Sequence, residues 1–534
     1  MKKSAGGLSP LLRVDRGSSR PLHAQIYAGF RTAILDRSLR AGERIPSTRT
    51  LARELGVSRI PALNAYSQLL AEGYFESRTG AGTFVSSSLP GFVEESETDR
   101  ERAGVNGHAR SSAARARNGT RDGARNGAAR GWQKAPSSRR KSRAGSRTRV
   151  LALRTATLPQ HTRPPWFGGT GAFSFSQPGV DAFPLHVWSK IVARYWRNVS
   201  MSALEYGDPM GQRSLREAIA TYLRTSRSVR CEWQQVMIVS GSQQALDVTT
   251  RVLLDAGSPV WIEEPGYWLA RNILTAAGCR IVAVPVDRDG LNVGAGIAAC
   301  RRARAAIVAP SHQFPLGATM SATRRLQLLE WARRESAWII EDDYDSEYRY
   351  DSKPIAALQG MDRSERVIYV GTFSKVLFPA LRVGYVVMPP DLMRHFIAVR
   401  HTMDVGPPHM IQAVLADFLN EGHFSRHIRR MRQIYAERRD VLINCISEQL
   451  SGVLEVQGAQ AGLHLTVTLP RGAKDRAICA MAAERKLWLW PLSPTYIGAG
   501  ARHGFILGYA GVTAQEIPAG VKRLRELLDE VGWK

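Results

Sequence analysis

The segment Val367–Tyr385, VIYVGTFSKVLFPALRVGY, decides how the C-terminal part of this 534-residue chain is interpreted. Its first four residues are apolar, which predicts a buried strand. The strand runs into a turn of small residues that holds Thr372, Ser374 and Lys375, and Arg382 follows seven residues after the lysine. Pyridoxal 5′-phosphate requires such a set: a lysine for an internal aldimine, and hydroxyls with an arginine for its dianionic phosphate. Lys375 is therefore the candidate catalytic and cofactor-binding lysine.

A carboxylate for the cofactor ring follows an earlier strand. In AWIIEDDYDSEYRY, residues 337–350, an apolar run ends in acidic residues. The cofactor acts as an electron sink only while its ring nitrogen stays protonated, which requires a fixed carboxylate. We predict that Asp342 is this partner and that Tyr344 hydrogen-bonds the phenolic oxygen of the ring.

Three more stretches add polar or aromatic residues after predicted strands. VMIVSGSQQALDVTTRVL (236–253) is a strand, a turn and a helix, and we expect Ser242 and Gln243 to bind the phosphate at the helix N-terminus. WIEEPGYW (261–268) places Tyr267 where it can stack on the ring, and APSHQFPLG (309–317) offers Gln313 as a ring or substrate contact. Because these motifs all follow strands, they should gather at one edge of a mostly parallel α/β sheet.

Composition divides the chain into three zones: residues 15–88, a linker over 89–165, and residues 166–534. Between 101 and 150 there are 14 lysines and arginines against 2 acidic residues, a net charge of +12 out of +26 for the whole chain. Such a segment buries too little apolar surface to fold, so we expect a flexible basic linker that adds salt-sensitive affinity for DNA or only solubility and spacing.

No run of eighteen apolar residues and no signal peptide are visible, so we expect no membrane association and a bacterial cytoplasmic, nucleoid-associated protein.

The first zone has the pattern of a winged helix-turn-helix. A helix is predicted over 20–37, with Ile26, Phe30 and Ile34 on one face. Ser47 and Ser58 are good N-cap residues for two further helices. We expect Leu63, Tyr66 and Leu70 to form the apolar face of the last helix, and two β-prone stretches around Gly80 and Gly82 to form the wing. The candidate contacts to DNA phosphates and base edges are Arg44, Ser47, Thr48, Arg49, Ser58, Arg59, Gly80, Gly82 and Thr83.

These motifs resemble known families. ERIPSTRTLARELGVSR (43–59) and AYSQLLAEGYFESRTGAGTFV (65–85) resemble the DNA-binding domain of GntR-family regulators. The motifs GSQQ, EEPGY, SHQFPLG, EDDYDSEY and TFSK, with FSFSQPGVDAFPLHVW (173–188) and YGDPMGQRSLREAIATYL (206–223), resemble fold-type I aminotransferases. The two parts in this order are similar to the MocR/GabR-like subfamily of GntR regulators. The resemblance implies a mostly parallel sheet with helices on both faces, a smaller C-terminal subdomain, and a head-to-tail homodimer in which each winged helix lies over the partner's larger domain.

Two departures from the aminotransferase pattern bear on function. Aminotransferases hold the substrate carboxylate with an arginine near the C-terminus, whereas GFILGYAG (504–511) has Ile506 at that position and Arg502 is the nearest arginine. Some relatives carry an arginine two residues after the EEPGY tyrosine, where this chain has Leu269, with Arg271 further on. We therefore favour a transcriptional regulator that senses a small amine, an amino acid or the cofactor itself through an aldimine on Lys375. The alternative is an active aminotransferase with an accessory DNA-binding module, and residual half-transamination is compatible with either.

Overall fold

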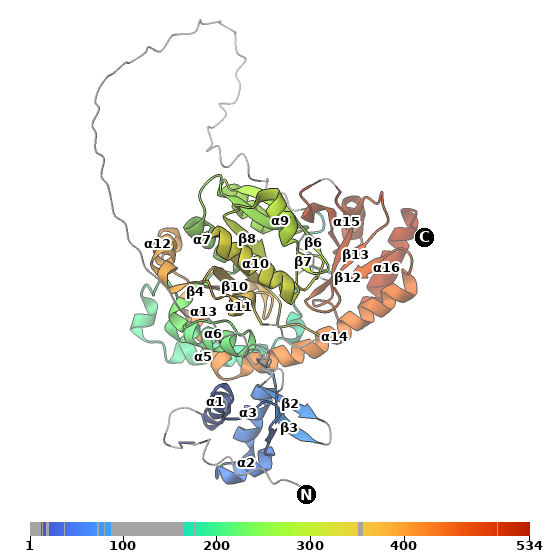
Figure 1. Ribbon diagram of the computed structural model, residues 1–534. Helices are drawn as coiled ribbons and strands as arrows, with labels where there is room; N and C mark the ends of the chain where they lie inside the picture. The colour runs from blue at the N-terminus through green and yellow to red at the C-terminus, as the bar shows by residue number, and fades with distance from the viewer. Residues whose placement is uncertain are drawn as a thin grey trace, which may run out of the picture. The chain divides into compact units, whose positions relative to one another are not determined.

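The structure, a computed structural model, describes residues 12, 14–15, 17, 21–36, 38–71, 74–78, 81–86, 158, 164–167, 169, 171–175, 177–350, 356–498 and 500–533 (Figure 1). Nearly all of the expected linker, residues 89–165, lies outside these residues, and so does Gly80. None of the helices in the described segments combines the length and the apolar character that crossing a membrane requires.

The N-terminal part consists of three helices and a small antiparallel sheet with the strand order β1-β3-β2. Its core joins Phe30, Tyr66 and Phe75, whose ring centroids lie 5.2–5.6 Å apart in edge-to-face contacts. Ile26 and Ile34 are buried beside Phe30, as the helical spacing predicts. The elements are α1 (Leu22–Leu35), β1 (Arg44–Ile45), α2 (Thr48–Glu54), α3 (Arg59–Ala71), β2 (Phe75–Arg78) and β3 (Gly82–Val85).

The predicted apolar face of α3 is confirmed at Tyr66, which is buried, and is wrong at Leu63. Leu63 is 46% exposed, and Leu70 is only partly buried. The buried face of α3 consists instead of Ala62, Ala65, Tyr66 and Leu69. The small alanines Ala62 and Ala65 let α3 pack closely against α1, and Leu63 lies on the exposed side of the helix.

The larger domain is built around an eight-stranded sheet with the order β4-β11-β10-β9-β8-β5-β6-β7. The strands from β10 through β9, β8 and β5 to β6 pair in parallel, as predicted, whereas β11 is antiparallel to both β10 and β4. The strands are β4 (Val236–Val239), β5 (Pro259–Glu264), β6 (Arg280–Asp287), β7 (Gly290–Leu291), β8 (Ala305–Val308), β9 (Trp338–Asp343), β10 (Val367–Thr372) and β11 (Gly384–Val387).

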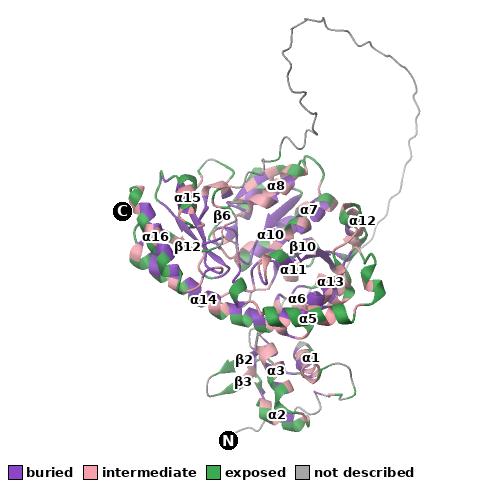
Figure 2. Ribbon diagram, turned by 180° about the vertical axis from the view of Figure 1, so that it is seen from behind, coloured by how far each residue is buried: buried purple, intermediate pink, exposed green. Residues whose placement is uncertain are grey.

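Helices cover both faces of this sheet, and Figure 2 shows the buried strands between helices whose outer sides are exposed. Along β5, Val260 and Ile262 pack beneath α7, α8 and α12, while Trp261 points to the opposite face and stacks on Trp331 of α10. This alternation follows from the two-residue repeat of a strand. The helices are α5 (Leu185–Arg197), α6 (Arg213–Ser226), α7 (Ser242–Leu253), α8 (Trp268–Ala276), α9 (Val293–Cys300), α10 (Ala322–Glu335), α11 (Leu358–Met361), α12 (Met393–Asp404) and α13 (His409–Asn420).

The long helix α14 (His423–Gln449) leads to a smaller C-terminal subdomain, drawn in orange to red in Figure 1. Its four-stranded antiparallel sheet has the order β12-β13-β15-β14. The elements are β12 (Glu455–Gln457), β13 (His464–Thr468), α15 (Asp475–Glu484), β14 (Trp490–Pro491), β15 (Gly504–Gly508) and α16 (Ile517–Glu530).

Candidate cofactor site and DNA-contacting residues

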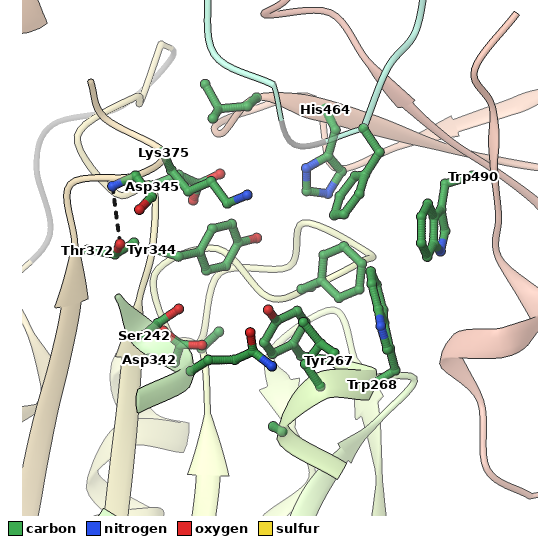
Figure 3. Close-up of a pocket in the computed structure, with 18 of the residues that line it drawn as sticks. Ser242, Tyr267, Trp268, Asp342, Tyr344, Asp345, Thr372, Lys375, His464 and Trp490 are labelled. Atoms are coloured by element: carbon green, nitrogen blue, oxygen red, sulfur yellow. Dashed lines mark hydrogen bonds between the residues drawn. The ribbon is translucent and has the colours of Figure 1, made fainter. Parts of the chain in front are cut away.

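A cavity of about 500 Å³ lies at the ends of the parallel strands, where the sequence motifs predict a ligand site. Figure 3 shows the Lys375 side chain extending into it. Eight of the nine residues predicted to bind the cofactor line this cavity: Ser242, Gln243, Tyr267, Asp342, Tyr344, Thr372, Lys375 and Arg382.

Gln313 is the exception, because it does not line the cavity. Its side chain is buried and donates to the carbonyl oxygen of Pro265 at 2.8 Å, and its amide oxygen accepts from the backbone N–H of Leu316 at 3.1 Å. The predicted contact of Gln313 with a ring or substrate is thus replaced by a structural one, which joins the loop after β8 to the loop after β5.

The turn between β4 and α7 forms a cradle for an anion. Gly241 has a positive φ of 88°, and a Cβ placed there would lie 3.1–3.2 Å from the Arg382 guanidinium, so only glycine permits this approach. The Arg382 guanidinium donates to the carbonyl oxygen of Ser240 at 2.7 Å. Because α7 begins at Ser242, its free backbone N–H groups and positive dipole end lie beside the arginine, which is an arrangement suited to a phosphate.

The acidic end of β9 supplies one carboxylate to the cavity. The Asp342 side chain is partly buried, and its Oδ1 atom is buried without a hydrogen-bond partner among the described residues. Burial, followed by the charges of Asp343 and Asp345, raises the pKa of Asp342 to about 7, although Lys375 acts in the opposite direction. A buried acceptor of this kind calls for a cationic or donating partner, such as a protonated ring nitrogen.

The next residue, Asp343, points to the other face of β9, as strand alternation requires. It forms an ion pair of 2.8 Å with Arg227, and both side chains are 3% exposed. The hydroxyl of Tyr369 donates to the same carboxylate, and Arg227 also donates to Ser311 Oγ at 2.7 Å. This buried network fixes the end of β9 from behind and thereby orients Asp342.

Lys375 lies in a setting that favours its neutral amine. Burial, with a smaller contribution from Arg382, lowers the pKa of Lys375 from 10.5 to about 8, although Asp345 and Asp342 act in the opposite direction. A neutral lysine amine can attack a carbonyl carbon, which an ammonium group cannot do. The turn that carries the lysine is held by a hydrogen bond of 3.2 Å from the Ser374 N–H to Thr372 Oγ1 (Figure 3).

Several lining residues were not predicted from the sequence. Glu263, at the end of β5, is buried in the cavity wall, and burial raises its pKa to about 8. Asp345 also lines the cavity, and its carboxylate lies 3.0 Å from Nδ1 of His312, a buried residue outside the lining whose Nδ1 is also 3.1 Å from the Tyr344 hydroxyl. A third set, called here the aromatic wall, consists of Phe167, Phe175, Trp268, Phe314 and Trp490. Asp345 could have been found from the sequence, because it follows Asp342 closely. The aromatic wall could not, because its residues come from five separate segments.

In the winged helix, the predicted DNA contacts lie around the start of α2, the start of α3 and the wing. Ser47 caps α2 by accepting from the Thr50 N–H at 3.2 Å. Arg59 Nε donates to Thr48 Oγ1 at 3.3 Å, which holds the two helix starts together. Arg44, Arg49, Ser58, Arg59 and Gly82 are exposed, and Thr83 is partly buried in β3.

The residues of the cavity fit pyridoxal 5′-phosphate. They provide a glycine-walled anion cradle, a buried carboxylate with an unpaired oxygen, and a lysine with a lowered pKa. Fold and site together therefore define a fold-type I, pyridoxal-phosphate-dependent aminotransferase-like domain joined to a winged helix.

Comparison with known proteins agrees with both parts. The chain matches the family model for aminotransferase class I and II over residues 176–524 and that for bacterial regulatory proteins of the gntR family over residues 22–85. An aminotransferase structure from Thermus thermophilus, α-aminoadipate aminotransferase LysN complexed with N-(5′-phosphopyridoxyl)-L-leucine, is 27% identical with a TM-score of 0.66 and covers 71% of this chain and 97% of its own.

Two relatives that align over nearly the whole chain are transcriptional regulators. The probable rhizopine catabolism regulatory protein MocR of Rhizobium meliloti is 38% identical over 96% of this chain and 95% of its own length. The regulator TauR of Rhodobacter capsulatus is 30% identical over 93% of this chain and 94% of its own. The chain belongs to the MocR-like subfamily of GntR-family transcriptional regulators, and it is a DNA-binding regulator with a pyridoxal-phosphate-dependent domain.

Proposed function

We propose that this regulator senses a small primary amine, which displaces Lys375 from pyridoxal 5′-phosphate and thereby changes how the protein binds DNA. The observation that carries the proposal is the enclosed Lys375 amine, with a pKa lowered to about 8, in a cavity that also holds an anion cradle and a free carboxylate oxygen. When bound, the cofactor supplies a carbonyl carbon that combines reversibly with primary amines.

The eight predicted cofactor residues that line the cavity have proposed roles toward that cofactor. Arg382, Thr372 and the start of α7 with Ser242 and Gln243 hold the phosphate. Asp342 keeps a proton on the ring nitrogen, and Tyr344 hydrogen-bonds the phenolic oxygen. Tyr267 packs against the ring, and Lys375 Nζ holds the cofactor until an effector amine replaces it.

The effect on DNA is proposed to be a population shift. An amine that binds one arrangement of the larger domain better than another moves the equilibrium between them. In a head-to-tail homodimer, such a change alters the spacing of two winged helices and hence their fit to two half-sites. We place this regulator in the bacterial cytoplasm, on the nucleoid.

The test uses the full-length protein loaded with the cofactor and a DNA duplex that it selects from a random pool. Fluorescence anisotropy at fixed salt measures DNA affinity before and after addition of a panel of primary amines. At least one amine should shift the affinity about fivefold or more in the wild type. The Lys522→Ala control, at an exposed lysine outside the cavity, should respond equally. An unchanged response in Lys375→Ala would refute the proposal, and steady transamination of an amino acid by the wild type would favour the enzyme instead.

A further inference from the structure

We infer that the effector is a primary amine without a carboxylate, carried on an aromatic body that stacks on the aromatic wall. The inference rests on the proposed function, because it concerns which amine displaces Lys375. It comes from what surrounds the cavity beyond the cofactor residues.

In the C-terminal subdomain, β15 has no cation at the position where aminotransferases carry the carboxylate-binding arginine. Ile506, at the centre of β15, is fully buried and pairs with Thr466 of β13 and Trp490 of β14. It packs with Trp490, Leu492 and Phe314 in one apolar cluster. An arginine is the usual partner for a carboxylate because its planar guanidinium binds both oxygens, and this position has an apolar side chain instead.

Arg502 and Arg271, the arginines closest in sequence to Ile506 and Leu269, are both engaged elsewhere. Arg502 Nη2 donates to Thr468 Oγ1 at 3.4 Å, and Arg271 donates to the carbonyl oxygens of Tyr496 and Pro494 at 3.3 and 3.4 Å. Neither lines the cavity, whereas Leu269, in the first turn of α8, does. Among the lining residues that the structure describes, Arg382 is the only arginine, and it belongs to the anion cradle.

The other titratable groups on the lining offer no positive charge that would compensate a second anion. Asp342, Asp345 and Glu263 all line it. His464 lies at the subdomain side, and burial, followed by repulsion from His312, lowers its pKa to about 3, so it is neutral at physiological pH. A carboxylate placed there would lose its hydration beside acidic groups and gain no described cation, which is a costly form of burial.

The aromatic wall indicates the shape of the effector. Trp268 and Trp490 stack with ring centroids 4.6 Å apart, and Phe175 lies 5.5 Å from Trp490. Figure 3 shows Trp268 and Trp490 on the side of the cavity away from Asp345 and Thr372. Flat rings gain from stacked and edge-to-face contacts with such a surface beyond the apolar area that they bury.

A matched pair of compounds tests the inference. 2-Phenylethylamine and L-phenylalanine differ only in the carboxylate, and butylamine lacks the ring. The full-length protein loaded with the cofactor is titrated with each compound, and both the visible absorbance of the bound cofactor and the affinity for the selected DNA are measured. The half-saturating concentration of 2-phenylethylamine should be at least about tenfold below that of L-phenylalanine and about threefold to tenfold below that of butylamine.

The outcomes separate this inference from the proposed function. If L-phenylalanine acts at an equal or lower concentration than 2-phenylethylamine, the carboxylate-free class is wrong while amine sensing stands. If butylamine equals 2-phenylethylamine, the aromatic body is wrong. If no primary amine changes either the absorbance or the affinity for DNA, the proposed function itself fails.

Substitutions probe the same two features. Leu269→Arg supplies the missing cation, so it should lower the half-saturating concentration of L-phenylalanine at least about tenfold, whereas Leu269→Met should not. Trp490→Ala should raise the value for 2-phenylethylamine about threefold to tenfold and that for butylamine less. Trp533→Ala, outside the cavity, is its control, and Trp490→Leu serves if the alanine variant does not fold. Equal losses for both amines in the Trp490 variants would overturn the stacking role.

Discussion

Lys375 should give the cofactor-free protein an unusual pH dependence for capture of pyridoxal 5′-phosphate. A lysine with a lowered pKa is protonated below that value and neutral above it, and only the neutral amine reacts. Burial lowers the pKa of Lys375 from 10.5 to about 8. At pH 7 about one such lysine in ten is neutral, against about one in 3,000 at the usual pKa, which is an advantage of about 300-fold at equal intrinsic reactivity.

The assay is stopped-flow absorbance of the cofactor, with Nα-acetyl-lysine, whose side-chain amine is free, as the reference compound. Titrations of the cofactor affect both reactions and cancel in the ratio of the two rates. This ratio should be constant below about pH 8 and then fall about tenfold per pH unit, because the protein amine is already neutral while the reference is still losing protons. A ratio that stays constant up to about pH 10 would refute the lowered pKa. Asp345→Asn removes a carboxylate that raises the pKa of Lys375, so it should move the break to lower pH.

Four further predictions concern other parts of the chain. Asp342→Asn removes the carboxylate that we propose to bind the ring nitrogen and should weaken cofactor binding at least about tenfold in a fluorescence titration. Arg227→Met leaves the Asp343 carboxylate buried without its partner and should cost about 3–5 kcal/mol in denaturant unfolding, whereas Arg288→Met, at a residue that is 95% exposed, should cost less than about 0.5 kcal/mol. Ser47→Ala removes the cap of α2, which should cost the winged helix about 1 kcal/mol by thermal unfolding. Deletion of residues 101–150 removes 14 basic side chains and should flatten the salt dependence of DNA binding; an identical slope would leave that segment as a spacer.

The cofactor residues were predictable because they follow strands. A run such as VIYVGT shows its burial and its end directly in the sequence, and parallel strands bring their carboxyl ends to one edge. Thr372, Lys375 and Asp342 are therefore placed together by topology alone. Their roles toward the cofactor stay predictions until the substitutions above are measured.

The features that the sequence did not predict depend on side-chain packing, which sequence periodicity does not encode. Gln313 follows a strand like the others, yet its amide turns back to Pro265, and no spacing rule distinguishes the two directions. Leu63 has the right chemistry for a core position and is exposed because neighbouring alanines pack more closely. Trp268 and Trp490 meet across more than two hundred residues, from a helix start and a short strand, so neither carries a local signal of the contact.

The division of the cavity between two sheets has a mechanical consequence. The residues proposed to hold the cofactor come from the eight-stranded sheet and its loops, whereas Trp490 and His464 belong to the strands of the C-terminal subdomain. An effector joined to the cofactor at one end and stacked on Trp490 at the other would act as a strut between the two sheets. Its length would then set how far apart they rest. A series of arylalkylamines with growing chains should accordingly produce graded changes in DNA affinity. The response of the regulator would then depend on the length of the ligand as well as on its chemistry.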